Sequence, residues 1–179
     1  DFKTACEHGF LGYPAFHIKH GSEFNNNVLE AFARRLPPRS RSDFGRYLEL
    51  KGLNPDVEMT DFSLLGYVGA KLPDDGFEIV HPFDSATAPF ELILEVAGFR
   101  YESEVPAAEI EKGDEITFTP EPDHKHDSGA IRIDRAGKKL GYVDRGRTQL
   151  LHSYLEKGHK VSGEVVRKNG TEQRPLIYI

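Results

Sequence analysis

The feature that most constrains the fold is residues 120–143, which have the pattern of a β-hairpin with a polar turn at its entrance. Ile131 and Ile133 alternate with polar or small residues, and this period of two is typical of a strand with one buried face. Gly137 lies where the chain must reverse, and Leu-Gly-Tyr-Val at 140–143 supplies a returning strand. We therefore expect two paired strands here.

The turn before this hairpin, residues 122–126, is made of polar and turn-forming residues. Asp127 is expected to cap it by accepting hydrogen bonds from nearby backbone N–H groups. Imidazole and carboxylate are also common metal ligands, and Asp123, His124, His126 and Asp127 lie together here. All four belong to one short turn, however, whereas useful metal sites hold their ligands from separate elements. We expect a rigid, exposed, polar loop and no metal.

The rest of the second half has the pattern of short strands and one helix. The expected elements are strands at 90–96 and 116–119, a helix capped by Asp144 and closed by Gly158, and a hairpin that pairs 160–167 with 175–179 across Asn169-Gly170.

Four separated elements of this half resemble the HIRAN domain family. They are Val-Ala-Gly-Phe-Arg-Tyr at 96–101, a proline after it, Asp-x-x-Ala-Ile-x-Ile at 127–133, and Gly-Tyr-Val at 141–143. The resemblance covers about residues 88–179. It implies a mostly-β barrel, similar to OB and SH3 barrels, with one helix. In the best understood relative, the module holds the 3′ end of single-stranded DNA.

The resemblance also implies a set of nucleic-acid-binding residues. Arg100 can meet a phosphate with two N–H groups, and the Tyr101 ring offers a face on which a base can stack. The alternative for this pair is packing of Tyr101 in the barrel and a surface ion pair of Arg100. The remaining positions of the implied site are His124, His126, Asp127, Tyr142 and Arg145.

Two of these positions depart from the family pattern. His124 and His126 stand where the DNA-binding relative has an amide side chain and a tyrosine. Histidine can still stack and donate, but its ring is smaller and its charge depends on pH. Asp127 matches an aspartate that can accept a hydrogen bond from a terminal 3′ hydroxyl, or else it is only the cap of its turn.

The first half has a mixed pattern of small helices and short strands. The expected elements are an edge strand over 13–18, a helix within 25–36 with a capping box of Asn27 and Glu30, a helix from about Ser42 to Gly52, a helical turn capped by Thr60, and a strand over 77–80.

Residues 10–82 resemble the N-terminal subdomain of HipA-type kinases. The likeness rests on Phe-Asn-Asn-Asn-Val-Leu-Glu-Ala-Phe at 24–32, Arg-Arg-Leu-Pro at 34–37 and Phe-Ser-Leu-Leu-Gly at 62–66. In that family the subdomain is a small α+β cap that contacts the kinase body and antitoxin partners, or a separate short protein. Phosphoryl transfer also needs a glycine-rich phosphate loop and a His-Arg-Asp loop, which this sequence lacks. We expect a protein partner here and no kinase activity.

A polar connector separates the two halves. His-Pro-Phe-Asp-Ser-Ala-Thr-Ala-Pro at 81–89 has a proline near each end, as short stiff linkers do. We therefore predict two separately cored domains: an α+β domain at 1–82, a linker at 83–89, and the barrel domain at 90–179.

The formal net charge of −6 argues against broad affinity for duplex nucleic acid. The charge is uneven, however. Residues 100–115 carry six acids against two bases, whereas 132–147 carry six bases against two acids. We expect a local basic face around the second strand pair, and the alternative is a hairpin with solvated charges.

Composition and motifs exclude several other classes. The single cysteine, Cys6, rules out an intrachain disulfide and a cysteine-rich zinc site. No apolar run approaches the ~20 residues that span a bilayer, and the start has no signal-peptide pattern, so we expect a cytoplasmic protein. No spacing pairs a nucleophile with His and Asp, and we expect neither an enzyme nor a cofactor.

Two functions follow from these patterns. The first is a DNA-binding module that recognises single-stranded DNA, or its 3′ end, through the HIRAN pocket. The alternative is a non-catalytic protein-interaction or regulatory module related to HipA-type toxin–antitoxin systems.

Overall fold

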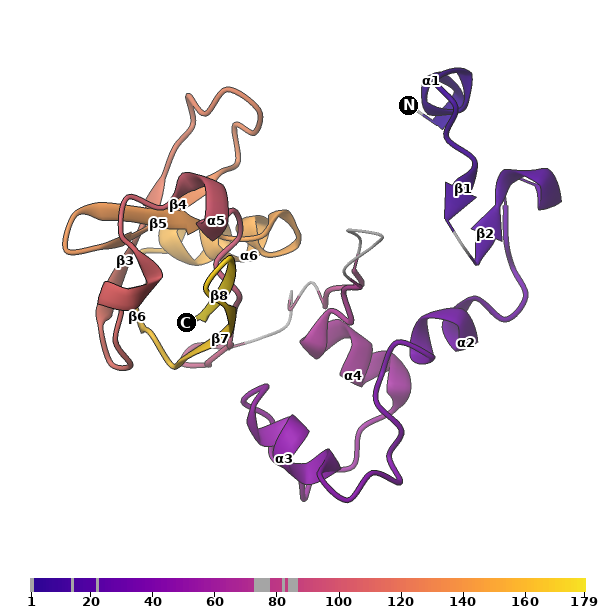
Figure 1. The fold of residues 1–179 in the computed structure, drawn as a ribbon, viewed down its shortest axis with the longest axis horizontal. Coiled ribbons are helices and arrows are strands. Elements are labelled where there is room, and N and C mark those ends of the chain that lie inside the picture. Colours follow the sequence, from indigo (N-terminus) through magenta and orange to yellow (C-terminus); the bar gives the residue numbers. More distant parts are fainter. Residues whose placement is uncertain (1, 14, 22, 73–77, 82, 84–86) are drawn as a thin grey trace. The chain divides into compact units, whose positions relative to one another are not determined.

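The structure is a computed structural model of residues 1–179, and it describes all of them except 1, 14, 22, 73–77, 82 and 84–86 (Figure 1). The chain divides into two compact units, Asp1–His81 and Pro82–Ile179. Part of the predicted 83–89 linker lies outside the described residues.

The first unit is built from short elements. They are α1 (Phe2–Glu7), β1 (Gly12–Tyr13), β2 (Phe16–His17), a 3-10 turn at Ile18–His20, α2 (Val28–Ala33), α3 (Phe44–Glu49) and α4 (Asp61–Val68). β1 and β2 pair antiparallel, so the predicted single edge strand over 13–18 is instead a small hairpin. The buried apolar side chains of the described part of this unit are Leu48, Leu64 and Leu65. Its core is therefore small.

The predicted helix starts have different outcomes. Thr60 caps α4 as predicted, because its side chain accepts a hydrogen bond from the Ser63 N–H at 3.1 Å. Asn27 precedes α2 but makes no side-chain cap bond, since its backbone is left-handed with φ 56°. Glu30 does not complete a capping box either, because Arg34 binds it at 2.6 Å. The capping-box prediction is wrong.

Two further boundaries differ from the sequence prediction. α3 runs from Phe44 to Glu49 and ends before Gly52, where the chain turns with φ 72°. Of the predicted strand over 77–80, Phe77 lies outside the described residues, and 78–80 form no strand. Ile79 instead donates a single backbone hydrogen bond to Gly69 O at 3.3 Å.

The second unit holds a four-stranded antiparallel sheet and a separate hairpin (Figure 1). Its elements are α5 (Phe99–Glu102), a 3-10 turn at Ala107–Glu109, β3 (Glu115–Pro120), β4 (Ile131–Arg135), β5 (Lys138–Tyr142), α6 (Arg145–Glu156), β6 (Gly163–Glu164), β7 (Arg167–Thr171) and β8 (Arg174–Tyr178). The sheet order is β5-β4-β3-β6, and β7 pairs with β8.

The central hairpin predicted from 120–143 is present. β4 and β5 pair antiparallel with Arg135 opposite Lys138. Ala136 and Gly137 make the reversal between them with φ of 48° and 79°, the positive values that a two-residue hairpin turn needs. Ile131 and Ile133 are fully buried, as their alternation predicted.

The predicted strand at 90–96 does not form a regular ladder. Leu94 and Ile179 exchange backbone hydrogen bonds at 2.9 Å, and Ala97 exchanges bonds with Tyr142 at 2.8 and 2.9 Å. Residues 94–97 thus touch both the β8 end and β5, but only through isolated bridges. Within the described residues the sheet does not close into the predicted barrel.

Gly141 explains why the Gly-Tyr-Val motif needs its glycine. Its φ is 154°, and a Cβ built there would collide with the carbonyl oxygen of Ala97 and lie 2.8 Å from Val96. The glycine therefore lets Tyr142 pair with Ala97, which fixes the segment leading into α5.

Two predicted details of the C-terminal part are wrong. The last hairpin reverses between Thr171 and Arg174, not at Asn169-Gly170, because the Thr171 hydroxyl accepts the Arg174 N–H at 3.1 Å. Asp144 precedes α6 but makes no cap bond, since its carboxylate turns to Arg147 at 2.8 Å.

The core of the second unit collects apolar side chains from nearly every element. It contains Leu94, Val96, Phe99, Val105, Ile110, Ile116, Ile131, Ile133, Leu140, Val143, Leu150, Leu151, Val165, Ile177 and Ile179. Among the residues that the structure describes, no helix has the length and apolar character needed to cross a membrane.

Candidate nucleic-acid interface

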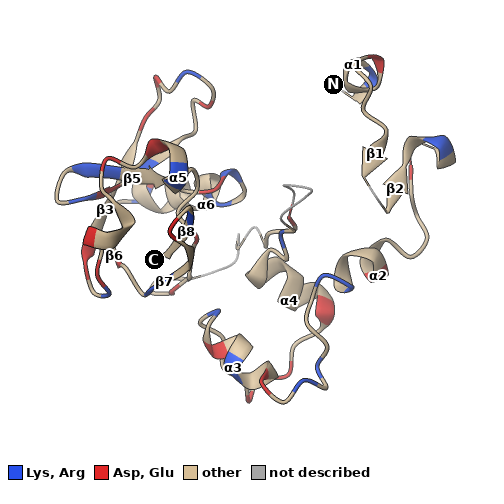
Figure 2. Cartoon of the chain, in the orientation of Figure 1, with Lys and Arg blue, Asp and Glu red and all other residues tan. Residues whose placement is uncertain are grey.

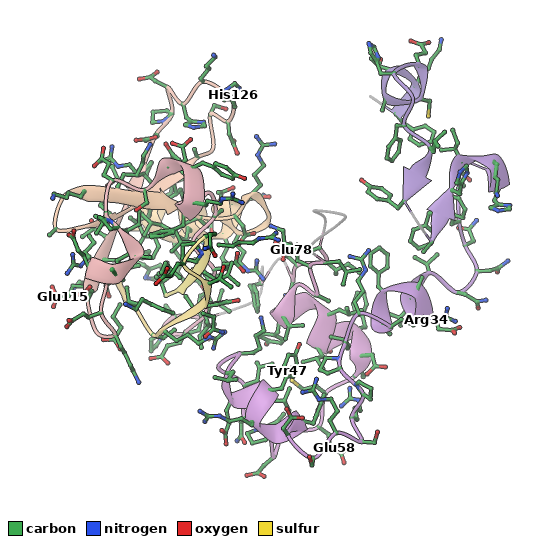
Figure 3. All side chains as sticks on the ribbon, in the orientation of Figure 1. Arg34, Tyr47, Glu58, Glu78, Glu115 and His126 are labelled. Atoms are coloured by element: carbon green, nitrogen blue, oxygen red, sulfur yellow. The ribbon has the colours of Figure 1, made fainter. Side chains whose placement is uncertain are left out.

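The loop 121–130 joins β3 to β4 and projects from the sheet, with His126 near its tip (Figure 3). Successive turns hold its backbone: His124 N–H donates to Glu121 O at 3.1 Å, and Ala130 N–H donates to Asp127 O at 3.0 Å. The His152 ring also lies 3.1 Å from Gly129 O. The loop is therefore tied to itself and to α6.

Asp127 connects this loop to α6. Its Oδ1 accepts the Gly129 N–H at 3.0 Å, which makes it the turn cap that the sequence predicts. Its Oδ2 lies 3.0 Å from Nε of Arg145, the first residue of α6. One carboxylate thus joins the loop to the start of the helix.

Arg145 is held in place but stays open to solvent. Its Nη2 donates to His126 O at 3.3 Å, and 75% of its side chain is exposed. The guanidinium has five N–H groups, so the pair with Asp127 leaves several of them accessible. The positive end of the α6 dipole lies at the same place, which favours an anion there.

His124 and Tyr142 meet on the inner side of the loop. Their ring centroids are 5.0 Å apart in an edge arrangement, and the His124 and His126 rings are 6.1 Å apart. The Tyr142 hydroxyl donates to Glu121 at 3.0 Å. Burial, and then this bond to Glu121, raise the pKa of Tyr142. The tyrosine is therefore a neutral, half-buried support for the loop.

Lys139 extends this cluster, and the sequence-based residue set missed it. Its Nζ lies 2.8 Å from Glu102 of α5 and 5.3 Å from the centre of the Tyr142 ring. The hydrogen bond with Glu102 raises the pKa of Lys139, and the same bond lowers the pKa of Glu102. The sequence feature that could have pointed to Lys139 is the excess of acids at 100–115 and of bases at 132–147. Lys139 couples α5 to β5.

Arg100 and Tyr101 lie on α5. The guanidinium of Arg100 is 5.3 Å from the centre of the Tyr101 ring, and Tyr101 is 80% exposed. The alternative that Tyr101 packs inside the barrel is therefore excluded. No contact that the structure describes joins either residue to 121–130, so a shared site of Arg100 and Tyr101 with Asp127 and Arg145 stays a prediction.

Arg100 also borders a shallow pocket of about 570 Å³ between α5 and the β7–β8 turn. Its polar lining residues include Ser103, Glu104, Glu172 and Gln173. Two acids line this pocket, so it is not a simple phosphate site.

Figure 2 shows acidic and basic residues interspersed over the second unit, and ion pairs largely neutralise the predicted basic face. The pairs are Arg132 with Glu121, Arg135 with Asp114, Lys139 with Glu102, Arg145 with Asp127, and Arg147 with Asp144. Two of these pairs, Arg135 with Asp114 and Lys139 with Glu102, join the basic segment 132–147 to the acidic segment 100–115. Charges that lie apart in the sequence are therefore close together in the fold. The expectation of a free basic face is therefore wrong.

Among the residues that the structure describes, no group of three or more His, Cys, Asp and Glu side chains lies close enough together to hold a metal ion.

Comparisons with known proteins agree with the sequence resemblance for the second unit. The HIRAN domain family matches residues 89–177. The crystal structure of the HIRAN domain of human HLTF is similar, with 18% identity over 49% of this chain and 74% of that chain, and a TM-score of 0.38. A protein from Lactobacillus plantarum is similar with 23% identity over 48% of this chain and 87% of that chain, and a TM-score of 0.41. No curated protein matches the chain.

The family match begins at residue 89 and does not include 10–82. The comparisons give no support to the HipA resemblance of the first unit. HIRAN domains as a family bind DNA. Residues 89–177 of this chain are a HIRAN domain.

Proposed function

We propose that the HIRAN domain of this chain binds single-stranded DNA at its 3′ end and catalyses no reaction. The observation that carries the proposal is the pair of Asp127 and Arg145, in which Oδ2 and Nε lie 3.0 Å apart. It sets an acceptor beside an exposed guanidinium at the start of α6. A 3′ terminus offers the complementary groups, a hydroxyl that donates and a phosphate that accepts.

Asp127 supplies the discrimination in this proposal. Its two oxygens accept from Gly129 and Arg145, but each carboxylate oxygen has room for a second hydrogen bond. A terminal 3′ hydroxyl can fill that place. A 3′ phosphate brings negative charge toward the carboxylate instead, and repulsion makes it the weaker ligand.

Arg145 supplies the phosphate contact. Its solvent-facing N–H groups can bind the phosphate that precedes the terminal nucleotide, and charge-assisted bonds of this kind are the stronger hydrogen bonds. The N-terminal end of α6 adds a favourable field for the same anion.

Tyr101, His124 and His126 supply ring faces for bases in this proposal. Tyr101 is exposed enough to stack without first leaving a packed position. His124 is already ordered against Tyr142, so it would lose little freedom on binding.

Single strands are the expected ligand because five of the six basic side chains at 132–147 are paired with acids. Affinity for a duplex depends mainly on unpaired positive charge along the backbone. Hydrogen bonds and stacking contacts to the 3′ end of a single strand do not need such a surplus of unpaired positive charge. The alternative function, protein interaction through residues 1–82, stays a prediction.

Fluorescence anisotropy tests the proposal. The full chain is titrated into labelled oligonucleotides that end in a 3′ hydroxyl, end in a 3′ phosphate, or form a blunt duplex. We expect the strand with a 3′ hydroxyl to bind most tightly, the strand with a 3′ phosphate to bind more weakly, and the blunt duplex to bind most weakly. Equal affinity for the blunt duplex and the single strand would contradict end recognition.

A further inference from the structure

A second basic segment lies in the first unit, outside the HIRAN domain. Residues 34–51 contain six of the 23 Lys and Arg of the chain but only two of its 29 Asp and Glu. Figure 2 shows the bases spread along the chain from the end of α2 to α3. We call this stretch the arginine segment, and its bases are Arg34, Arg35, Arg39, Arg41, Arg46 and Lys51.

Exposure separates three bases of this segment from most of the paired bases of the HIRAN domain. Four of the five paired bases of the HIRAN hairpin and α6 are largely covered, with exposed side-chain fractions of 35% for Arg132, 27% for Arg135, 22% for Lys139 and 8% for Arg147, and the exception is Arg145 at 75%. In the arginine segment the fractions are 76% for Arg34, 50% for Arg41 and 70% for Arg46. The covered pairs hold the fold, whereas these three face solvent.

The acids that pair with the exposed arginines are close in sequence and are also exposed, at 57% for Glu30, 56% for Asp43 and 52% for Glu49. Arg34 binds Glu30 at 2.6 Å, and Arg46 binds Glu49 at 3.2 Å, each within one turn of helix. Exposed ion pairs contribute only about 0–1 kcal/mol, so an incoming phosphate can replace the carboxylate at small cost.

Arg41 shows the geometry that a phosphate needs. Its Nε and Nη2 bind the two oxygens of Asp43 at 2.8 and 2.6 Å. This is the planar two-bond arrangement that a guanidinium also makes with phosphate, and that lysine cannot make. Arg39 differs, because it holds Asp61 at 2.7 Å and Met59 O and so fixes the segment against the start of α4.

We propose that the arginine segment is a second nucleic-acid contact, in which Arg34, Arg41 and Arg46 bind the phosphodiester backbone without reading sequence. The choice of nucleic acid over an acidic protein rests on the proposed function, because a strand held by the HIRAN domain brings phosphates to this chain. The contact itself does not depend on a 3′ end.

The test compares two triple variants of the full chain with the same change in charge. R34Q/R41Q/R46Q removes the proposed contact, and K3Q/K112Q/K160Q removes three exposed lysines elsewhere. Each is titrated into a single strand of about 24 nucleotides between about 50 and about 200 mM salt. We expect the arginine variant to lower the slope of log K against log salt by about 2, since each phosphate contact on a single strand contributes about 0.7. The lysine variant should change it little.

A variant that is expected to tighten DNA binding is also tested, because misfolding could explain weaker binding by the triple variant but not tighter binding. Asp43→Asn releases Arg41 and should tighten binding, because Asp43 makes no cap bond to α3. Asp56→Asn makes the same charge change at an exposed position and is the matched control. Tighter binding in D43N than in D56N supports the contact, and equal binding in the two contradicts it.

The results of these titrations distinguish the arginine-segment contact from the proposed 3′-end site at Asp127 and Arg145. If the wild type shows no preference for a 3′ hydroxyl but the arginine variant still lowers the salt slope, the proposed function fails and this contact stands. Equal slopes in the two triple variants overturn this contact. If poly-glutamate competes as well as DNA of equal charge, the choice of nucleic acid is wrong.

Discussion

Asp127 and Arg145 form the link between the loop 121–130 and helix α6, with Oδ2 and Nε 3.0 Å apart. Because Asp127 also caps its own turn through Gly129, one side chain fixes both the shape of the loop and the position of the guanidinium. The pair is an acceptor and a donor that a DNA end can contact together.

Arg145→Gln should weaken binding of a single strand and lower its salt slope by about 0.7, the contribution of one phosphate contact. The side chain is 75% exposed, so the thermal midpoint should change little. Anisotropy over a salt series measures the slope, with Lys160→Gln as a control of equal charge. An unchanged slope would exclude a phosphate contact at Arg145.

Tyr101→Ala should cost roughly 1–3 kcal/mol of binding free energy, the usual value of one stacked base. Tyr101→Phe keeps the ring face and should bind like the wild type. Since the ring is 80% exposed, neither variant should lower stability in urea unfolding. If the alanine and phenylalanine variants bind equally well, Tyr101 does not stack on a base.

Ile133→Ala should lower the free energy of unfolding by about 2–5 kcal/mol, because the side chain is fully buried in the centre of the sheet and its loss leaves a cavity. Lys138→Ala at the exposed hairpin tip is the control and should change it by less than about 0.5 kcal/mol. Urea unfolding gives both values. Similar values for the two variants would contradict the placement of β4 in the core.

Asp114 should make stability depend on acid pH. A hydrogen bond from the Glu111 N–H, and then the bond from Arg135, lower the pKa of this carboxyl. A lowered pKa in the folded state stabilises the protein above the unfolded value of about 3.9, and that stability is lost as the pH falls through the folded pKa. At neutral pH the free energy of unfolding in urea should be larger for the wild type than for Asp114→Asn. The difference between the two proteins should shrink as the pH falls below about 3.9. A difference that does not change with pH would show that the charge of Asp114 is not involved.

The sequence predicted the parts of the fold that local patterns determine. The alternation of Ile131 and Ile133 and the reversal at Gly137 gave the central hairpin, and the hydroxyl of Thr60 gave the start of α4. Side chains with two available partners were not predictable. Asp144 could cap α6 or pair with Arg147, and Asn27 could cap α2 or take a left-handed backbone; only the folded chain decides between these.

The candidate site was predictable in its residue types but not in its electrostatics. Asp127 and Arg145 do meet, although they lie far apart in sequence. The pairing of Lys139 with Glu102 depends on α5 folding beside β5, which no local pattern specifies. For the same reason the sequence suggested a basic face where the fold has paired charges.

The most direct test of end recognition is the ratio of affinities for a 3′ hydroxyl and a 3′ phosphate on the same single strand, measured for wild type and Asp127→Asn. Asparagine can still accept the Gly129 N–H but carries no charge to repel a phosphate. We predict a clear preference for the hydroxyl in the wild type, a smaller preference in the variant, and similar thermal midpoints. A folded Asp127→Asn variant that keeps the full wild-type preference would show that Asp127 is only a turn cap, and would contradict the account.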